Sequence, residues 1–189
     1  MSAEQAVSRD ELVAYLDEYL GVKGMKDWSE NGLQVEGNDA VRRLAFAVDA
    51  SLASIQDAVT AGADMLIAHH GLFWGKPLRI VGSHRRRVKT LLDSGCNLYA
   101  AHLPLDRHPE VGNNAQLAAL LGLPVVGEFG DAFGVPIGVI CEAKPALTLD
   151  ELVGRVRNAV GEPALALSGG EQRIRRVGII SGGAAGEIG

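Results

Sequence analysis

Short apolar runs alternate with segments of helical periodicity along the first two thirds of the chain. The runs, each as long as one strand, lie at residues 44–48, 65–68 and 97–101. Apolar residues recur every three or four positions, as on one face of a helix, in residues 52–62, 83–94 and 114–121. Strands that are apolar throughout and alternate with helices form parallel sheets covered on both faces. The pattern therefore predicts an α/β fold with mostly parallel sheets flanked by helices.

Two helix starts are marked by capping sequences. Ser8 and Glu11 stand three residues apart before an apolar periodic segment, and Thr148 and Glu151 repeat this spacing. In a capping box the hydroxyl accepts the glutamate N–H, while the glutamate carboxylate accepts the N–H of the capping residue. We expect one helix to begin directly after Ser8 and another directly after Thr148. The apolar run Val135–Cys141 predicts a strand ahead of the second helix.

The pattern changes near residue 127, where glycine and proline interrupt the alternation. We predict that residues 1–126 form a first α/β half, and that residues 127–189 hold an insert and the start of a second, similarly built half. Two segments share the order apolar, Arg, Arg, apolar, small, apolar: Val41–Phe46 and Ile174–Ile179. Chance explains this echo as well as a duplicated unit does. If the unit is duplicated, the second copy is incomplete, and we expect a truncated chain.

Composition narrows the class of protein. The chain has 189 residues, of which 47% are hydrophobic and 22% charged, as in one or two small globular domains. Its net charge of -5 argues against a protein that coats nucleic acid or anionic membranes, and it has no run of about 18 uncharged apolar residues for a membrane span. Cys96 and Cys141 form no C-x-x-C pair, so we expect both to be small buried apolar side chains. We expect a cytoplasmic protein without a membrane or nucleic-acid partner.

Four of the five histidines follow apolar runs, at the positions where parallel strands would end. In open α/β sheets ligands bind at this edge, so the two histidine segments would meet there if their strands are neighbours. His69 and His70 are adjacent, and neighbouring strand residues point to opposite faces. A strand that ends between them at Gly71 would let them serve two metal ions, which in hydrolytic sites lie about 3.5–4 Å apart. The alternative is a pair of polar loop residues whose imidazoles bond to backbone.

The second segment, residues 101–109, adds a carboxylate to these imidazoles. Asp106 offers a hard oxygen ligand, suited beside His102 to Zn, Mn, Fe or Mg. Asp106 equally fits an ordinary helix or turn cap, because proline and glycine surround it. His108 is expected at the surface. The two segments together favour a metal site.

Residues 76–89 contain six basic side chains and no acid: Lys76, Arg79, Arg85, Arg86, Arg87 and Lys89. This local positive charge suits phosphates or another anionic partner. The alternative is a solvated helix face near a subunit contact. The sequence contains neither G-x-S-x-G nor G-x-x-x-x-G-K-[ST], so we expect neither the hydrolase elbow nor the phosphate loop that these motifs build.

Four segments stand in a characteristic order. They are Glu-Asn-Gly-Leu-Gln-Val at 30–35, Ala-Val-Asp-Ala-Ser at 47–51, Leu-Ile-Ala-His-His-Gly-Leu-Phe-Trp at 66–74, and Asn-Leu-Tyr-Ala-Ala-His-Leu-Pro-Leu-Asp at 97–106. With Gly-Asn-Asn at 112–114, this set resembles the NGG-interacting-factor-three-like family. Members of that family are also called dinuclear-metal-centre proteins or GTP cyclohydrolase type 2 homologues. The resemblance covers the chain from about Asp10 to Gly183.

The resemblance implies a fold, an assembly and a ligand set. The fold is α/β with two similarly built halves, and the assembly is a ring-shaped homohexamer whose metal sites face an internal cavity. The implied metal ligands are His69, His70 and Asp106, and His102 is implied as a nearby site residue. An intact relative is expected to hold two divalent metal ions per subunit, with Zn, Mn, Fe and Mg as candidates.

The chain departs from the family pattern near its C-terminus. The family supplies a further His and Glu four residues apart, and no histidine follows His108 here. The missing Glu bridges both ions in the family. Two imidazoles and one carboxylate cannot saturate two ions that each take four or more ligands. We therefore expect weak or single metal occupancy and an activity below that of an intact relative.

Two functions follow from these residues and the resemblance. The first is metal-dependent hydrolysis of a nucleotide-like or phosphorylated substrate, in the manner of a GTP cyclohydrolase type 2 homologue, with His102 as the proton shuttle. The basic residues at 76–89 would suit such a substrate. The second is a non-catalytic, metal-binding hexameric adaptor that presents its surface to protein partners.

Overall fold

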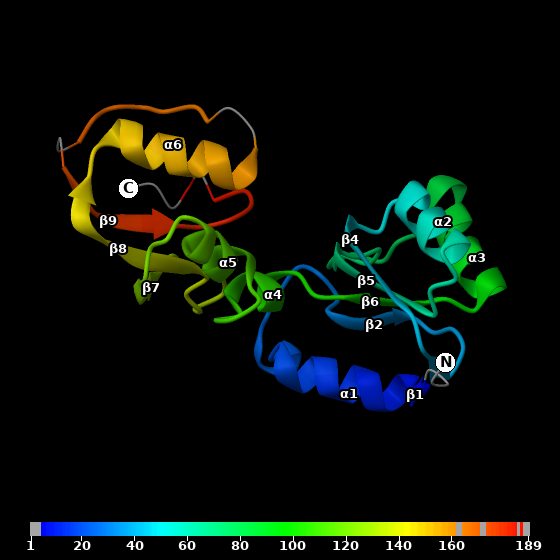
Figure 1. Cartoon of the computed structure of the whole chain (residues 1–189). Helices are drawn as coiled ribbons and strands as arrows, with labels where there is room; N and C mark the ends of the chain where they lie inside the picture. Colours follow the sequence, from blue (N-terminus) through cyan, green and yellow to red (C-terminus); the bar gives the residue numbers. More distant parts are fainter. Residues whose placement is uncertain (1–4, 162–163, 171–172, 185, 187–189) are drawn as a thin grey trace. The chain divides into compact units, whose positions relative to one another are not determined.

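The computed structural model describes residues 5–161, 164–170, 173–184 and 186 of the chain (Figure 1). They form two compact units, Met1–Leu105 and Asp106–Gly189. Each unit has its own sheet and its own buried apolar cluster, with helices packed against the sheet. The predicted α/β class is therefore confirmed. The predicted halves, 1–126 and 127–189, concern a change of pattern along the sequence and stay a prediction.

The first unit is built on a four-stranded sheet. Its elements are β1 (Val7–Ser8), α1 (Arg9–Tyr19), the 3-10 turn η1 (Val22–Gly24), β2 (Gly32–Val35), β3 (Ala40–Val41), β4 (Leu44–Asp49), α2 (Leu52–Thr60), β5 (Met65–His70), α3 (Gly82–Ser94), β6 (Asn97–Ala100) and the start of α4 (Leu103–Arg107). The sheet order is β2-β6-β5-β4. Strands β4, β5 and β6 are parallel and β2 is antiparallel to β6, while β1 and β3 form a separate antiparallel pair. The apolar runs thus predicted the three parallel strands correctly.

Different helices cover the two faces of this sheet (Figure 1). On one face α2 and α3 bring Ile55 and Leu91 into the main buried cluster. On the other face α1 packs over Met65 and Tyr99. Tyr99 is fully buried, and its hydroxyl donates to Asp17 of α1 at 3.0 Å. Burial and this carboxylate raise the pKa of Tyr99 far above its ordinary value, so the phenol stays protonated and remains a donor.

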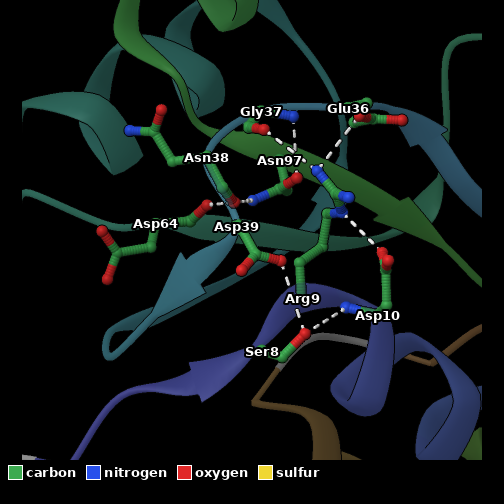
Figure 2. Close-up of polar contacts among 9 residues, drawn as sticks. All are labelled: Ser8, Arg9, Asp10, Glu36, Gly37, Asn38, Asp39, Asp64 and Asn97. Carbon is green, nitrogen blue, oxygen red and sulfur yellow. Dashed lines mark hydrogen bonds and ion pairs between the residues drawn. The ribbon is translucent and has the colours of Figure 1, made fainter.

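A polar network joins the start of α1 to the start of β6 (Figure 2). At its centre is the fully buried Asn97 side chain. Its Nδ2 donates to the carbonyl oxygens of Asn38 at 2.9 Å and Asp64 at 3.0 Å, and its Oδ1 accepts the N–H of Gly37 at 2.8 Å. Arg9 adds a bond to the Gly37 carbonyl at 3.2 Å. Because a buried amide is costly unless bonded, these partners fix where β6 begins.

The second unit contains a three-stranded antiparallel sheet. Within the described residues its elements are α5 (Asn113–Leu120), β7 (Val125–Phe129), β8 (Gly138–Leu147), α6 (Leu149–Val160) and β9 (Ile174–Ile179). The strand order is β7-β8-β9, and both pairings are antiparallel. Its core contains apolar residues from helices, strands and turns. They are Ala118, Leu121, Leu123, Cys141, Ala143, Leu147 and Ile179.

The strand predicted at Val135–Cys141 has the wrong bounds. Ala132 and Val135 instead bond to each other through their backbones, at 2.9 and 3.1 Å, and close a tight turn. The strand therefore begins at Gly138 and continues to Leu147. Apolar side chains in the turn made it look like strand.

One of the two predicted capping boxes forms. At α6 the Thr148 hydroxyl accepts the Glu151 N–H at 3.2 Å, and Glu151 accepts the Thr148 N–H at 2.7 Å, which lowers the pKa of Glu151. At α1, Ser8 is the N-cap, but its hydroxyl accepts the N–H of Asp10 at 3.3 Å and donates to Asp39 at 3.4 Å. The box expected at Ser8 is wrong, since its hydroxyl accepts the N–H of Asp10 in place of that of Glu11.

Two expectations from composition can be followed in the structure. Cys96 and Cys141 are 1% and 0% exposed, and burial raises the pKa of both thiols, as suits small apolar core residues. Among the helices of the described residues, none has the length and apolar content to cross a membrane.

Candidate metal centre

Three histidines meet at the carboxyl ends of two neighbouring parallel strands. His69 and His70 end β5, and His102 lies two residues beyond β6. These strands pair side by side as far as Ala68 and Ala100, so the residues that follow emerge at the same edge of the sheet. One ring nitrogen of each histidine lies within 4.8 Å of one ring nitrogen of each of the other two. The structure thus brings the two predicted segments together at these side chains.

The three imidazoles are tilted against one another. Their centroids are 4.6 Å apart for His69 and His70, 5.0 Å for His69 and His102, and 5.6 Å for His70 and His102, with interplanar angles of 49°, 52° and 50°. Adjacent residues inside a strand would point to opposite faces. The short distance between His69 and His70 shows that the regular alternation ends at this dipeptide.

A buried carboxylate holds His102 in place. Its Nδ1 lies 2.9 and 3.1 Å from the two carboxylate oxygens of Asp27, whose side chain is 1% exposed. Asn31 bridges the pair: its Nδ2 donates to Asp27 at 2.9 Å, and its Oδ1 accepts the backbone N–H of His102 at 2.8 Å. The N–H groups of Ser29 and Leu103 also donate to Asp27, at 3.1 and 3.0 Å. An imidazole whose Nδ1 donates to a carboxylate keeps Nε2 as its acceptor.

The same contacts determine the ionisation of Asp27. Burial alone would raise the pKa of this carboxyl group. The hydrogen bonds from His102 and Asn31, with those from the N–H groups of Leu103 and Ser29, outweigh burial and lower the pKa of Asp27 to about 2. Asp27 is therefore a carboxylate at neutral pH and accepts the bond from Nδ1 of His102.

A second carboxylate holds His70, at the surface. Asp49 ends β4, and its register partner on β5 is His70. Nδ1 of His70 lies 2.7 Å from Oδ1 of Asp49. The side chains are 41% and 66% exposed, respectively. Two of the three imidazoles therefore have Nδ1 bonded to a carboxylate.

Trp74 forms one wall of the cluster. Its ring centroid lies 5.8 Å from that of His70 and 5.0 Å from that of His102. Its Nε1 donates to the Gly71 carbonyl at 3.1 Å, which fixes the ring. Trp74 and Lys76 also line an open cavity of about 530 Å³ between the segments 30–34 and 73–78. A cavity of this size beside polar side chains has room for a small-molecule ligand.

The turn after the histidine pair leaves no room for a side chain. A Cβ added at Gly71 would overlap with the amide of Gln34 and lie 2.6 Å from the Cβ of Ala100. The Gln34 amide is itself bonded on both sides: Oε1 accepts the N–H of Leu72 at 2.6 Å, and Nε2 donates to the carbonyl of Glu30 at 2.6 Å. Glycine lets the backbone approach this closely.

The donor set fits a divalent metal ion. Imidazole nitrogen is a ligand of Zn and Fe, and three protein ligands with one open position are typical of catalytic zinc sites. Metal-bound histidines ordinarily donate their other ring N–H to a carboxylate or carbonyl. His70 and His102 have this arrangement, with Asp49 and Asp27 as the carboxylates. The histidine cluster therefore has both the ligand atoms and the supporting hydrogen bonds of a metal centre.

Asp106, the predicted carboxylate ligand, belongs to the second unit. Its side chain is buried, and Oδ1 accepts from Nδ2 of Asn113 at 2.6 Å and from the Ser181 hydroxyl at 3.0 Å. Nδ2 of Asn114 lies 3.3 Å from the Asp106 carbonyl. These bonds tie α4 to the start of α5 and to the segment after β9. The role of Asp106 as a metal ligand stays a prediction.

The surface position expected for His108 is wrong. His108 is 9% exposed, and its Nδ1 accepts the N–H groups of Glu110 and Val111 at 3.2 Å each. The imidazole therefore closes the turn that precedes α5.

The basic residues at 76–89 lie in three different settings. Lys76 lines the cavity beside Trp74. Arg85, Arg86 and Lys89 are exposed on α3, as expected for a solvated helix face, whereas Arg87 is half-buried with Nη1 3.5 Å from the Ala50 carbonyl.

Sequence reasoning did not identify Asp27, Asn31, Asp49 or Trp74 as site residues. Asp49 could have been found, because it ends an apolar strand beside the one that ends at His70 and the same edge rule applies. Asp27 lies outside any periodic segment, and nothing in its sequence neighbourhood indicates a partner 75 positions away.

Comparison with known proteins agrees with this fold. An α/β chain whose parallel strands end in a histidine cluster supported by carboxylates is a candidate metalloprotein. The profile of the family described as Duf34/NIF3 (NGG1p interacting factor 3) matches residues 7–189. The chain belongs to the Duf34/NIF3 family, which confirms the resemblance seen in the four sequence segments.

Relatives match most of this chain and about 70% of their own length. A Deinococcus radiodurans protein named "GTP cyclohydrolase 1 type 2 homolog" is 49% identical over 182 residues, which are 96% of this chain and 69% of the relative. The Escherichia coli (strain K12) protein of the same name is 43% identical over 175 residues, 92% of this chain and 69% of the relative. The crystal structure of TTHA1606 from Thermus thermophilus has a TM-score of 0.85 and 46% identity, covering 95% of this chain and 72% of that one.

Proposed function

We propose that this chain binds a divalent metal ion at the cluster of His69, His70 and His102 and there hydrolyses a nucleotide-like or phosphorylated substrate. The observation that supports the proposal is the pair of hydrogen bonds from Nδ1 of His70 to Asp49, at 2.7 Å, and from Nδ1 of His102 to Asp27, at 2.9 Å. Carboxylates in these positions fix the tautomer and make Nε2 a better ligand.

Each residue of the cluster has a role in this proposal. When bound, a divalent ion supplies Lewis-acid polarisation of a substrate oxygen and activation of water. His69 and His70 hold the ion, and Asp49 orients His70. His102, oriented by Asp27, takes a proton from the attacking water and delivers it to the leaving group, as histidines held by a carboxylate do. The alternative role for His102 is that of a third ligand.

The cavity beside the cluster suggests the substrate class. The Trp74 ring offers a surface on which an aromatic heterocycle stacks, and the Lys76 ammonium offers a partner for phosphate. GTP is the first substrate to test, because the Deinococcus and Escherichia relatives carry GTP cyclohydrolase in their names.

Two expectations from the family resemblance belong to the same proposal. Asp106 adds a carboxylate ligand, and the chain assembles as a homohexamer.

Metal content and turnover of the full chain test the proposal. The chain is loaded separately with Zn, Mn and Fe, dialysed, and analysed for bound metal by mass spectrometry, and turnover is followed with GTP and a panel of phosphoesters. His70→Ala should lose both bound metal and turnover. His84→Gln is the matched control, because His84 lies in α3 outside the cluster, and it should keep both.

The variants also separate the roles and the alternatives. His102→Ala should keep the metal and lose about 10²–10⁴-fold in turnover if it moves the proton, whereas loss of both would make it a ligand. Asp106→Asn should lower metal content if Asp106 is a ligand. Metal bound without turnover of any substrate would contradict the hydrolase and favour the adaptor, and a chain that binds no metal would contradict the whole proposal.

A further inference from the structure

Strand β4 has an exposed apolar side at the edge of its sheet. Leu44, Phe46 and Val48 are 38%, 73% and 64% exposed, and they alternate with Ala45 and Ala47, which pack into the main buried cluster. Within the described residues β4 pairs with β5 on one side and with no strand on the other. Phe46 and Val48 are therefore large apolar side chains that the described part of the fold leaves uncovered.

The backbone of β4 is also open on this side. The Arg43 carbonyl accepts the N–H of Met65 in β5 at 3.4 Å. Successive residues of a strand direct their N–H and C=O groups to opposite edges, so Leu44 and Phe46 direct theirs away from β5. Natural edge strands are ordinarily protected by lysine, proline or a bulge. β4 has no lysine or proline, and its register with β5 continues without a bulge.

We propose that this edge of β4 binds the same edge of a second copy of the chain, antiparallel and centred on Phe46. In this register Phe46 faces the partner's Phe46, and Leu44 faces the partner's Val48. Arg43 faces the partner's Asp49. A twofold axis through the Phe46 pair repeats each of the other contacts, as in isologous dimers.

Charge complementarity supports this occupant and this register. Arg43 is exposed and Asp49 is 66% exposed, and they lie three residues to either side of Phe46. Arg43 uses Nη1 on the Ala61 carbonyl, and Asp49 uses Oδ1 on His70, so each keeps other polar atoms for the partner. Opposite charges across antiparallel strands stabilise the pairing.

The neighbouring registers lack these contacts. A register centred on Ala45 or Ala47 would place Arg43 away from the partner's Asp49. An unrelated protein would have to supply the same apolar and charged positions in reverse order, whereas a second copy has them already.

Molecular mass in solution tests the surface. The wild-type chain and its variants are measured by light scattering and sedimentation over a range of concentrations. Phe46→Glu opposes two like charges at the twofold axis, so the mass should fall to half or less and the dissociation constant should rise at least about tenfold, the loss expected for a central interface residue. Leu92→Glu is the matched control, since Leu92 is 58% exposed on α3, and it should leave the mass unchanged.

A charge exchange tests the register. Leu44→Lys and Val48→Glu should each weaken the assembly, because each places a charge against an apolar side chain. The double variant should recover most of the wild-type mass, since Lys at 44 then faces Glu at 48 of the partner subunit twice. Within one strand these two positions are too far apart to pair with each other.

Disulfide trapping gives a second view of the register. Hydrogen-bonded antiparallel pairs have Cα atoms about 5.5 Å apart, a separation that a disulfide spans. Phe46→Cys should therefore form a covalent dimer on mild oxidation. Val48→Cys should not, because it faces position 44. Cys96 and Cys141 are buried and do not compete.

The outcomes decide between acceptance and rejection. A wild-type chain that is monomeric at every concentration overturns the proposal, as does an assembly that Phe46→Glu leaves intact. Failure of the double variant to recover, or crosslinking of Val48→Cys as fast as Phe46→Cys, overturns the register. None of these results depends on metal or turnover, so they are independent of the proposed hydrolase.

Discussion

The candidate metal centre contains two histidine–carboxylate pairs that have the same chemistry and differ in how deeply the carboxylate is buried. Asp27 is 1% exposed and accepts hydrogen bonds from His102, Asn31 and two backbone N–H groups. Asp49 is 66% exposed, and the described residues give it one hydrogen-bond partner, His70. The same pair is thus built once inside the fold and once at its surface.

Because of this difference in burial, both carboxylates orient a histidine of the metal centre, but they contribute unequally to the stability of the fold. A buried carboxylate is tolerated because its hydrogen bonds are made, so removing it leaves donors unpaired. Asp27 joins parts of the chain that are 75 positions apart, whereas Asp49 joins neighbouring strands at their exposed ends. We expect Asp49 to affect metal binding through His70 and Asp27 to affect turnover through His102, and we expect Asp27 alone to affect stability strongly.

The largest effect is expected for Asp27→Ala. The buried donors of His102, Asn31 and Leu103 lose their acceptor, so the free energy of unfolding should fall by about 3 kcal/mol. Turnover should fall by about 100-fold, because His102 loses its orientation. Urea denaturation and the turnover assay measure the two effects. Asp57→Asn, an exposed position on α2, is the control and should change neither.

Acid should selectively remove the stabilisation that the ionised, buried Asp27 carboxylate gives to the folded protein. The pKa of Asp27 is about 2 in the folded protein, against an ordinary value of 3.8. A carboxyl group whose pKa is lowered by folding stabilises the protein above its unfolded pKa, and this stabilisation is lost as the pH falls through the folded pKa. Between about pH 4 and pH 2 the wild type should lose about 2 kcal/mol more than Asp27→Asn. Denaturation at each pH measures the free energy of unfolding. Equal losses in the wild type and in Asp27→Asn would contradict this expectation.

A smaller effect is expected for Asp49→Asn. Metal affinity should fall about tenfold, since His70 loses its carboxylate. The free energy of unfolding should change by less than about 0.5 kcal/mol, because exposed ion pairs contribute little. Metal titration beside urea denaturation measures both. A stability loss as large as that of Asp27→Ala would remove the contrast between the two pairs.

The smallest effect is expected for Trp74→Leu. The ring contacts both His70 and His102, at 5.8 and 5.0 Å. Aromatic contacts of this kind contribute about 0.5–1.5 kcal/mol, so metal affinity should fall about threefold. Trp74→Phe keeps a ring and should lose less. Isothermal titration of metal into both variants measures these affinities. An unchanged affinity in Trp74→Leu would contradict a contribution of the ring.

The sequence predicted most of the first unit because its signals are local. The apolar runs became β4, β5 and β6, and helical periodicity predicted α2 and α3 within a residue or two. The edge rule brought His69, His70 and His102 to one rim. These features depend on residues close together in the chain, or on a general rule of parallel sheets.

What the sequence could not predict depends on distant contacts. The antiparallel sheet of the second unit follows from pairings that periodicity does not encode, and a turn closed by Ala132 and Val135 resembled a strand. The capping hydroxyl of Ser8 also donates to Asp39, 31 positions away. The Asp27–His102 pair is of the same kind, because a buried acid in an irregular segment has no local pattern.

The crowding at Gly71 means that the shape of the cavity can change while the donor atoms of the histidine cluster stay the same. One extra methyl group there removes no ligand, charge or ring, yet it must displace the Gln34 amide that joins two loops beside the imidazoles. A substitution at this position thus alters the contour of the cavity while every donor atom remains. Among natural variants, a larger residue at 71 would therefore identify a reshaped pocket even where the histidines are all retained.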